Sequence, residues 1–103
     1  MYTNPYYSPE EMGLETVADL EMREPDWDFD LVAVWKHTET GRLYWAADSG
    51  CSCPTPFEDY TSLDKLTPLS SENYDELKRY VASCTSSGKR AAFLRKVRTA
   101  LKK

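Results

Sequence analysis

The residue types best suited to chemistry are concentrated in one segment, Asp48-Ser-Gly-Cys-Ser-Cys-Pro-Thr-Pro-Phe-Glu-Asp-Tyr60. Its two cysteines, Cys51 and Cys53, form a Cys-x-Cys pair. Thiolates bind zinc or act as nucleophiles. Two cysteines this close in the chain could also switch between a dithiol and a disulfide. Cys84 and His37 would complete a Cys3His ligand set in number. The pair therefore raises three chemical hypotheses: a zinc site, a nucleophilic cysteine and a redox switch.

The expected strand geometry separates the single histidine from this cysteine pair. His37 should lie at the turn of a hairpin, whereas the strand that ends near Cys51 should return to about Phe29. At about 3.3 Å per residue, the two ends are about 26 Å apart. A base or a cation would be needed to activate the thiol, and the nearest charged residues are acidic. We therefore expect Cys51 and Cys53 to be small buried hydrophobic residues in a proline-pinned loop, with no metal and no cofactor.

Four carboxylates in or near the same segment could bind a hard cation or act as general acid and base: Asp48, Glu58, Asp59 and Asp64. Their spacing does not match a calcium-binding loop, and the chain has no glycine-rich phosphate cradle. Carboxylates that cap turns are the simpler interpretation. The sequence thus predicts no catalytic residue and a protein that is not an enzyme.

The elements that would position these residues belong to one domain, residues 1–103. The chain is 41% hydrophobic and carries a formal net charge of −4, which suits a soluble globular domain. Three cysteines cannot all pair, and no apolar run is long enough to span a membrane, so we expect a cytoplasmic protein. Residues 1–12, rich in Tyr and Pro, predict an arm. Within it, Ser8 and Pro9 start a helix that Gly13 should stop after about one turn.

Alternation and β-branched or aromatic residues predict three strands, at about 14–22, 28–37 and 42–48. In the first strand only Val17 is out of phase with the apolar positions. Between the second and third strands, Gly41 suits a short turn with a bulge residue. That turn pairs Thr38 with Arg42 and places Trp35 opposite Trp45. The expected faces are Leu31, Ala33, Trp35, Leu43, Trp45 and Ala47 on one side, with Val32, Val34, Tyr44 and Ala46 on the other.

Residues 48–69 predict an ordered irregular segment, followed by two helices at about 71–84 and 89–101. Ser70 and Ser71 suit a helix cap, and the second helix has an apolar stripe that includes Phe93 and Val97. The fold class is therefore α+β: a three-stranded antiparallel sheet, an irregular Cys/Pro loop, and two C-terminal helices.

The net charge conceals a strong segregation along the chain. Residues 1–30 carry nine acids against Arg23 alone, whereas residues 86–103 carry seven bases and no acid. The basic helix could be neutralised within the fold or merely solvated, could bind an acidic protein, or could approach nucleic acid. Large aromatic residues add candidate anchors, because Trp and Tyr are common at interface hot spots. The candidate partner-binding residues are Arg90, Arg95, Lys96, Arg98, Trp27, Phe57 and Tyr60.

The segment Leu31-Val-Ala-Val-Trp-Lys, with Gly41-Arg-Leu-Tyr-Trp-Ala-Ala and the Cys/Pro segment that follows it to Tyr60, resembles a family of small proteins. These functionally uncharacterised proteins come from actinobacteriophages, mycobacteriophages among them, and from actinobacteria. The resemblance runs from about Phe29 to Leu66. It implies a phage or actinobacterial cytoplasmic origin and brings no known catalytic residue.

Together these features predict a non-enzymatic protein-interaction module, a phage accessory protein that acts on a host or phage protein as a monomer or homodimer. The alternative is a nucleic-acid-binding phage protein that uses its basic C-terminal helix.

Overall fold

The computed structural model describes residues 9–21, 28–51, 65–84 and 87–102. Its elements are η1 (Pro9–Met12), β1 (Leu14–Glu21), β2 (Asp28–His37), β3 (Leu43–Cys51), β4 (Thr67–Leu69), α1 (Tyr74–Tyr80), η3 (Val81–Ser83) and α2 (Ser87–Leu101). The predicted α+β class with an antiparallel sheet and two C-terminal helices is confirmed. The short 3-10 helix η1 ends at Met12 and is followed by Gly13, whose φ of 71° is accessible to glycine at little cost.

The sheet has four strands in the order β1-β2-β3-β4, so the prediction of three strands was wrong. The added strand pairs with the start of β3, with Leu69 opposite Leu43. Sequence analysis missed it because Thr67-Pro68-Leu69 is too short to show alternation and has a proline at its centre. Proline is tolerated there because β4 is an edge strand, where one backbone N–H has no partner strand to meet.

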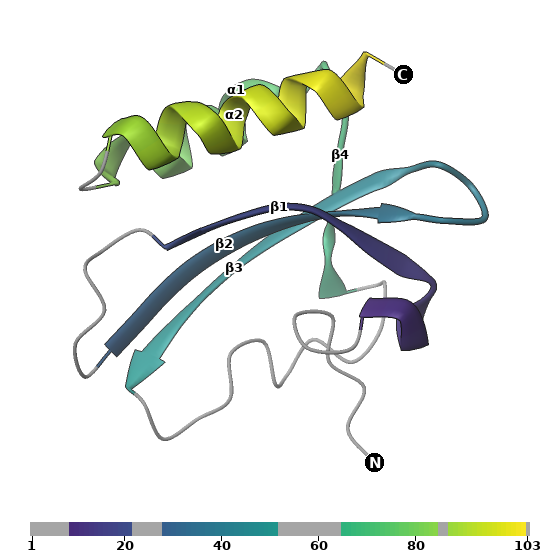
Figure 1. Ribbon diagram of the computed structural model, residues 1–103, viewed down its shortest axis with the longest axis horizontal. Helices are drawn as coiled ribbons and strands as arrows, with labels where there is room; N and C mark the ends of the chain where they lie inside the picture. The colour runs from purple at the N-terminus through teal and green to yellow at the C-terminus, as the bar shows by residue number, and fades with distance from the viewer. Residues whose placement is uncertain (1–8, 22–27, 52–64, 85–86, 103) are drawn as a thin grey trace.

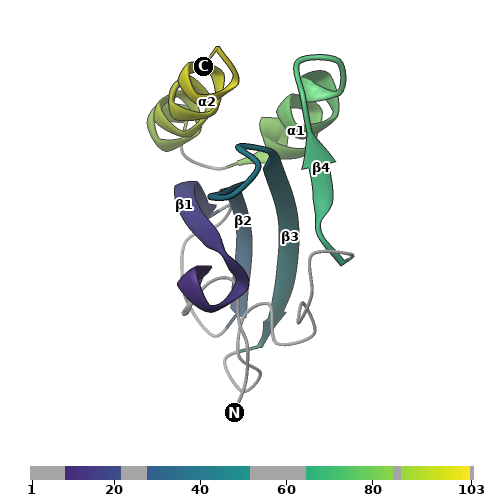
Figure 2. The same cartoon turned by 90° about the vertical axis from the view of Figure 1, so that its right-hand side faces the viewer.

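Both α-helices cover the same face of the sheet, as Figure 1 shows. Figure 2 shows them side by side, with α2 on the side of β1 and α1 on the side of β4. The core between the two layers joins Val32 and Val34 of the sheet to Leu77, Phe93 and Val97 of the helices. A second buried cluster on the opposite face is centred on Trp35.

The register of the β2–β3 hairpin differs by one residue from the prediction. Trp35 lies opposite Tyr44, and Trp45 lies opposite Val34. His37, not Thr38, closes the turn, because its N–H donates to the carbonyl of Arg42 over 2.7 Å. The N–H and hydroxyl of Thr38 both donate to the carbonyl of Gly13 instead, which ties the turn to the start of β1.

This slip reverses the face assignment of one strand relative to the other, since side chains alternate with a period of two. Trp45 and Ala47 share the helix-covered face with Val32 and Val34. The other face combines Leu31, Ala33 and Trp35 of β2 with Tyr44 and Ala46 of β3. The predicted grouping of Trp35 with Trp45 was therefore wrong, and both faces of the sheet contain buried residues.

A β-bulge between Thr16 and Ala18 explains why Val17 breaks the alternation of β1. Before the bulge, Leu14 packs into the cluster around Trp35. After it, Ala18 and Leu20 pack beneath the helices. The apolar residues of β1 therefore serve both faces of the sheet, where an uninterrupted strand would have placed them on one.

The first predicted helix, 71–84, is shorter than expected and the second is confirmed. α1 begins at Tyr74, and the chain continues from Val81 as the 3-10 helix η3. The predicted serine cap is replaced by a turn in which the Asn73 side chain accepts from the N–H of Ser70 and donates to the carbonyl of Pro68. Asn73 thus ties the start of α1 back to β4.

We expect Gly13→Ala to lower the free energy of unfolding by about 1–2 kcal/mol, because a Cβ at positive φ is strained. The added atom would also lie 3.4 Å from Nε2 of His37. Gly88→Ala is the matched control, since this glycine in α2 has open space around it and alanine favours helices. Urea denaturation of both variants measures the difference. Equal stability of the two variants would contradict the assigned backbone conformation of Gly13.

Candidate functional site

The sheet places the chemical candidates from the sequence at opposite ends. His37 pairs with Leu14 beside the hairpin turn, whereas Cys51 pairs with Asp28 at the far end of the same strands. Cys84 is buried near that far end, and its thiol donates to the carbonyl of Glu21 over 3.7 Å. Cys53 and the carboxylates Glu58, Asp59 and Asp64 lie outside the described residues. Among the residues that are described, no three His, Cys, Asp or Glu side chains gather as a metal site.

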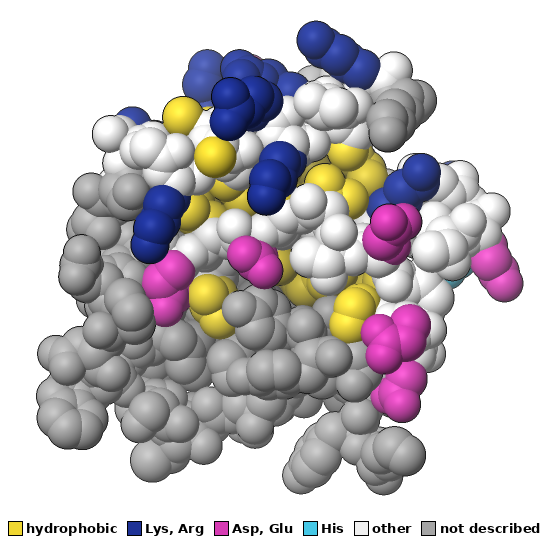
Figure 3. Space-filling view, viewed as in Figure 1, with side chains coloured by type: hydrophobic (Ala, Val, Ile, Leu, Met, Phe, Trp, Pro, Cys, Tyr) yellow, Lys and Arg dark blue, Asp and Glu magenta, His cyan; other side chains and the backbone are white. Residues whose placement is uncertain are grey.

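The basic side chains of the C-terminal helix are positioned by its apolar stripe. Phe93 and Val97 are buried against the sheet, which fixes how α2 is rotated about its axis. The remaining surface of the helix is therefore exposed beside or away from the sheet, and it carries no acid. We call its exposed bases the basic face of α2: Lys89, Arg95, Lys96, Arg98 and Lys102. Figure 3 shows Lys and Arg side chains gathered along this helix.

Arg90, another predicted partner-binding residue, occupies a different position. It is half-buried, and its guanidinium donates to the carbonyl of Ala82 over 2.9 Å. Ala82 belongs to η3, so this bond connects α2 to the end of the preceding helical segment. Arg90 thus serves the packing of the two helices, and its charge is held away from the basic face.

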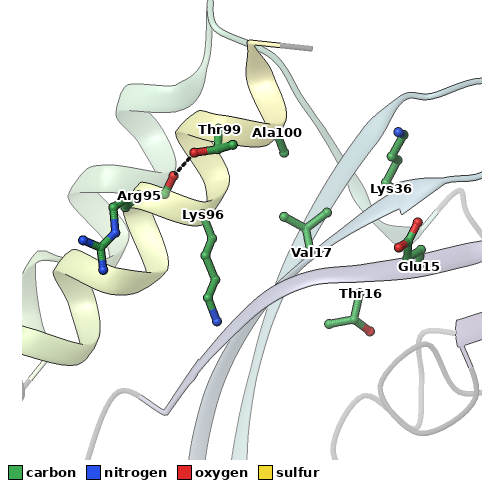
Figure 4. Close-up of a pocket in the computed structure, with 8 residues that line it drawn as sticks. All are labelled: Glu15, Thr16, Val17, Lys36, Arg95, Lys96, Thr99 and Ala100. Carbon is green, nitrogen blue, oxygen red and sulfur yellow. Dashed lines mark hydrogen bonds between the residues drawn. The ribbon is translucent and has the colours of Figure 1, made fainter.

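A groove lies between β1 and α2, with a volume of about 500 Å³. From the sheet, it is lined by Glu15, Thr16 and Val17 of β1 and by Lys36 of β2. In Figure 4, Val17 points towards the helix, while Lys36 and Glu15 lie together at one end. Lys36 and Glu15 are register partners in the sheet, which explains why they project beside each other.

The helix wall of this groove is formed by Arg95, Lys96, Thr99 and Ala100. Lys96 extends towards β1 in Figure 4, and the Thr99 hydroxyl donates to the carbonyl of Arg95 over 3.0 Å. Arg98 lies elsewhere, beside Tyr74 of α1. The predicted bases are therefore divided between two surfaces. We call the first surface the β1–α2 groove.

Lys36 was missed by the sequence analysis, although it is the base that joins Arg95 and Lys96 at this groove. Its signal was weak, because it is an isolated charge at the end of the apolar run of β2. Alternation alone would place it on the same face as Val32 and Val34. Once the helices are known to cover that face, Lys36 must project towards them.

Three bases of α2, namely Arg95, Lys96 and Arg98, are exposed on the surface. Within the part of the chain that the structure describes, no carboxylate forms an ion pair with Arg95, Lys96 or Arg98. Figure 3 shows acidic side chains below the row of basic side chains, with hydrophobic atoms exposed between the two in the middle of the view. Arg95, Lys96 and Arg98 therefore remain available to an external anion. The predicted aromatic anchors Trp27, Phe57 and Tyr60 lie outside the described residues.

Comparison with known proteins identifies a family and nothing more specific. The family model described as Domain of unknown function (DUF7574) matches residues 3–103. Neither the curated proteins nor the solved structures contain a match to the chain. In the described residues, no helix has the length and apolar character needed to cross a membrane.

Proposed function

The chain belongs to the DUF7574 family, and we propose that it is a small, non-enzymatic cytoplasmic module that binds an acidic partner protein through the basic face of α2. The resemblance around Leu31–Tyr60 supports a bacteriophage accessory protein that acts on a host or phage protein. The observation that carries the proposal is the exposure of Arg95, Lys96 and Arg98 without an ion pair to a described carboxylate.

Acidic protein suits this surface better than nucleic acid does. The described acids Glu15 and Asp19 are exposed on β1, the strand that contacts α2. A nucleic-acid duplex presents closely spaced phosphates over a long surface, so it would meet this repulsive strand as well as the attractive helix. A protein partner can place its carboxylates opposite the helix alone. Charge complementarity of this kind sets specificity and association rate.

Exchanging Arg95, Lys96 and Arg98 together for glutamine should weaken binding to poly-L-glutamate by about tenfold or more. Each base is expected to contribute several tenths of a kcal/mol to the binding free energy, and tenfold corresponds to about 1.4 kcal/mol. The matched control exchanges Lys65, Lys78 and Arg79 for glutamine. These bases are also exposed, and the net charge changes equally. Fluorescence anisotropy at several salt concentrations measures both variants and the parent protein.

Two outcomes would contradict the proposal. Equal weakening in both triple variants would show that only net charge matters. Tighter binding of a DNA duplex than of poly-L-glutamate, lost in the α2 variant and falling steeply with salt, would favour the nucleic-acid alternative. A partner recovered from host lysate should compete with poly-L-glutamate for the parent protein.

A further inference from the structure

The outer edge of β1 lies under an overhang formed by α2. β1 is the first strand in the sheet order, and in the described chain no strand pairs with its outer side. Figure 2 shows α2 above this edge, displaced to the side away from β2. A strand added next to β1 would therefore lie beneath the helix and beside the β1–α2 groove. Exposed sheet edges bind extended peptides through main-chain hydrogen bonds.

The two faces of such an added strand would meet opposite charges. On the helix-covered side, the groove contains Lys36, Arg95 and Lys96 against the single carboxylate of Glu15. On the other side, alternation after the bulge directs Asp19 away from the helices, since Ala18 and Leu20 pack beneath them. The groove thus favours acids at alternate positions of the added strand, and the opposite face disfavours them.

We propose that the β1–α2 groove binds an extended acidic peptide segment of a partner protein, which pairs with the outer edge of β1 and directs every second, acidic side chain towards Lys36, Arg95 and Lys96. This inference rests on the proposed function and specifies its site and the form of its ligand. The intervening side chains of the segment are neutral or basic, because they face Asp19.

The bulge determines how the segment is held along its length. Regular pairing is available at Ala18–Glu21, whereas the ladder is interrupted between Thr16 and Ala18. Where pairing is interrupted, the groove offers side-chain contacts instead, with Val17 and Ala100 as its apolar part. β1 has eight residues, so a segment of about eight residues spans both halves.

A second copy of this chain fits the edge poorly. Antiparallel pairing of β1 with β1 through the regular part of the strand would set Asp19 of one copy close to Asp19 of the other on the same face. Like charges placed opposite each other destabilise a sheet. The same pairing would offer the bases of the groove few carboxylates beyond Glu15. Charge therefore selects a foreign acidic segment over self-association.

The first test uses two fluorescein-labelled peptides of equal composition. One alternates Glu and Thr over eight residues, and the other has four Glu followed by four Thr. We expect the alternating peptide to bind the full chain at least about tenfold more tightly, because it alone places all its acids on one face of a strand. Equal affinity of the two peptides would overturn the inference.

The second test separates strand addition from simple charge attraction. In an extended strand, the N–H groups of alternate residues point to opposite edges. Two methylated peptides are therefore compared, one with the backbone nitrogens of the four Glu methylated and one with those of the four Thr methylated. Methylation of the set that points at β1 should abolish binding, and methylation of the other set should leave the affinity within about twofold. Equal effects of the two methylation patterns would show that the peptide does not pair with the edge of β1.

The third test uses a residue outside the basic face of α2. Lys36→Glu should weaken binding of the alternating peptide by about tenfold or more. Lys65→Glu makes the same charge change at an exposed site and should change the affinity by about twofold or less. Unfolding curves show whether each variant is folded. Poly-L-glutamate binding that depends on Arg98 but not on Lys36 would overturn the groove inference while leaving the proposed function intact. Absence of any binding to acidic polypeptides would overturn both.

Discussion

Replacing Trp35 by alanine should lower the free energy of unfolding by about 3–5 kcal/mol, the cost of removing a large buried aromatic side chain. Trp35 has no exposed surface and is the largest fully buried residue of the described chain. It packs on the face of the sheet away from the helices, within the cluster Leu14, Leu31, Ala33, Ala46 and Leu66. The free energy of unfolding of a small domain is about 5–15 kcal/mol, so this single change removes a large share of the stability.

Two further variants make the Trp35 experiment specific. Trp35→Phe keeps most of the apolar volume and should cost clearly less than the alanine variant. Tyr80→Ala removes an aromatic ring that is 43% exposed and forms an edge contact with Trp45, so it should cost about 1 kcal/mol. Urea denaturation followed by circular dichroism measures all three. A loss below about 1 kcal/mol for Trp35→Ala would contradict the burial of this face.

Val97→Asp should cost about 4 kcal/mol or more at neutral pH, because it places a carboxyl group in the core between α2 and the sheet. Val97 is fully buried there. Burial raises the pKa of an introduced carboxyl group, so its protonated form is the one the folded state tolerates. The destabilisation relative to the parent should therefore shrink as the pH falls and grow as it rises.

The matched control for this variant is Ala91→Asp, which adds the same charge at an exposed position of the same helix. Its expected cost is below about 1 kcal/mol and reflects helix propensity alone. Val97→Ala, at about 1–3 kcal/mol, keeps the protein folded if the aspartate variant does not fold. Thermal and urea unfolding at pH 7 and pH 5 provide the measurements. Equal costs at positions 91 and 97 would contradict the docking of this face of α2.

Local patterns predicted most helices and strands, because the tendency to form either depends on residues that are close together in the sequence. The strand 28–37 was located to the residue, since Phe29 to Trp35 is a continuous β-favouring run. The helix 89–101 was located through the stripe that contains Phe93 and Val97. Gly13 was identified as a stop, and its positive φ is the reason. The expectations for Cys53, Trp27, Phe57 and Tyr60 fall outside the described residues and stay predictions.

The errors in the sheet concern which residues lie opposite one another. Two turns that differ by one residue satisfy the same local preferences at Gly41, yet they place Trp45 on opposite faces of the sheet. Thr38 decided between them through its bonds to Gly13, which lies far away in the chain. The bulge at Val17 and the pairing of β4 likewise depend on the neighbouring strands, so no window of sequence contains the information.

Sequence by itself determined the α+β composition and the separation of acids and bases along the chain. Only the tertiary structure decided that the acidic strand β1 lies beside the basic helix α2, and that Lys36 joins Arg95 and Lys96 at one groove. The physical reason is that the sequence gives the order of the charged residues along the chain, whereas packing decides which of them become neighbours on the folded surface. Burial of Phe93 and Val97 orients the helix, and the sheet register orients Lys36.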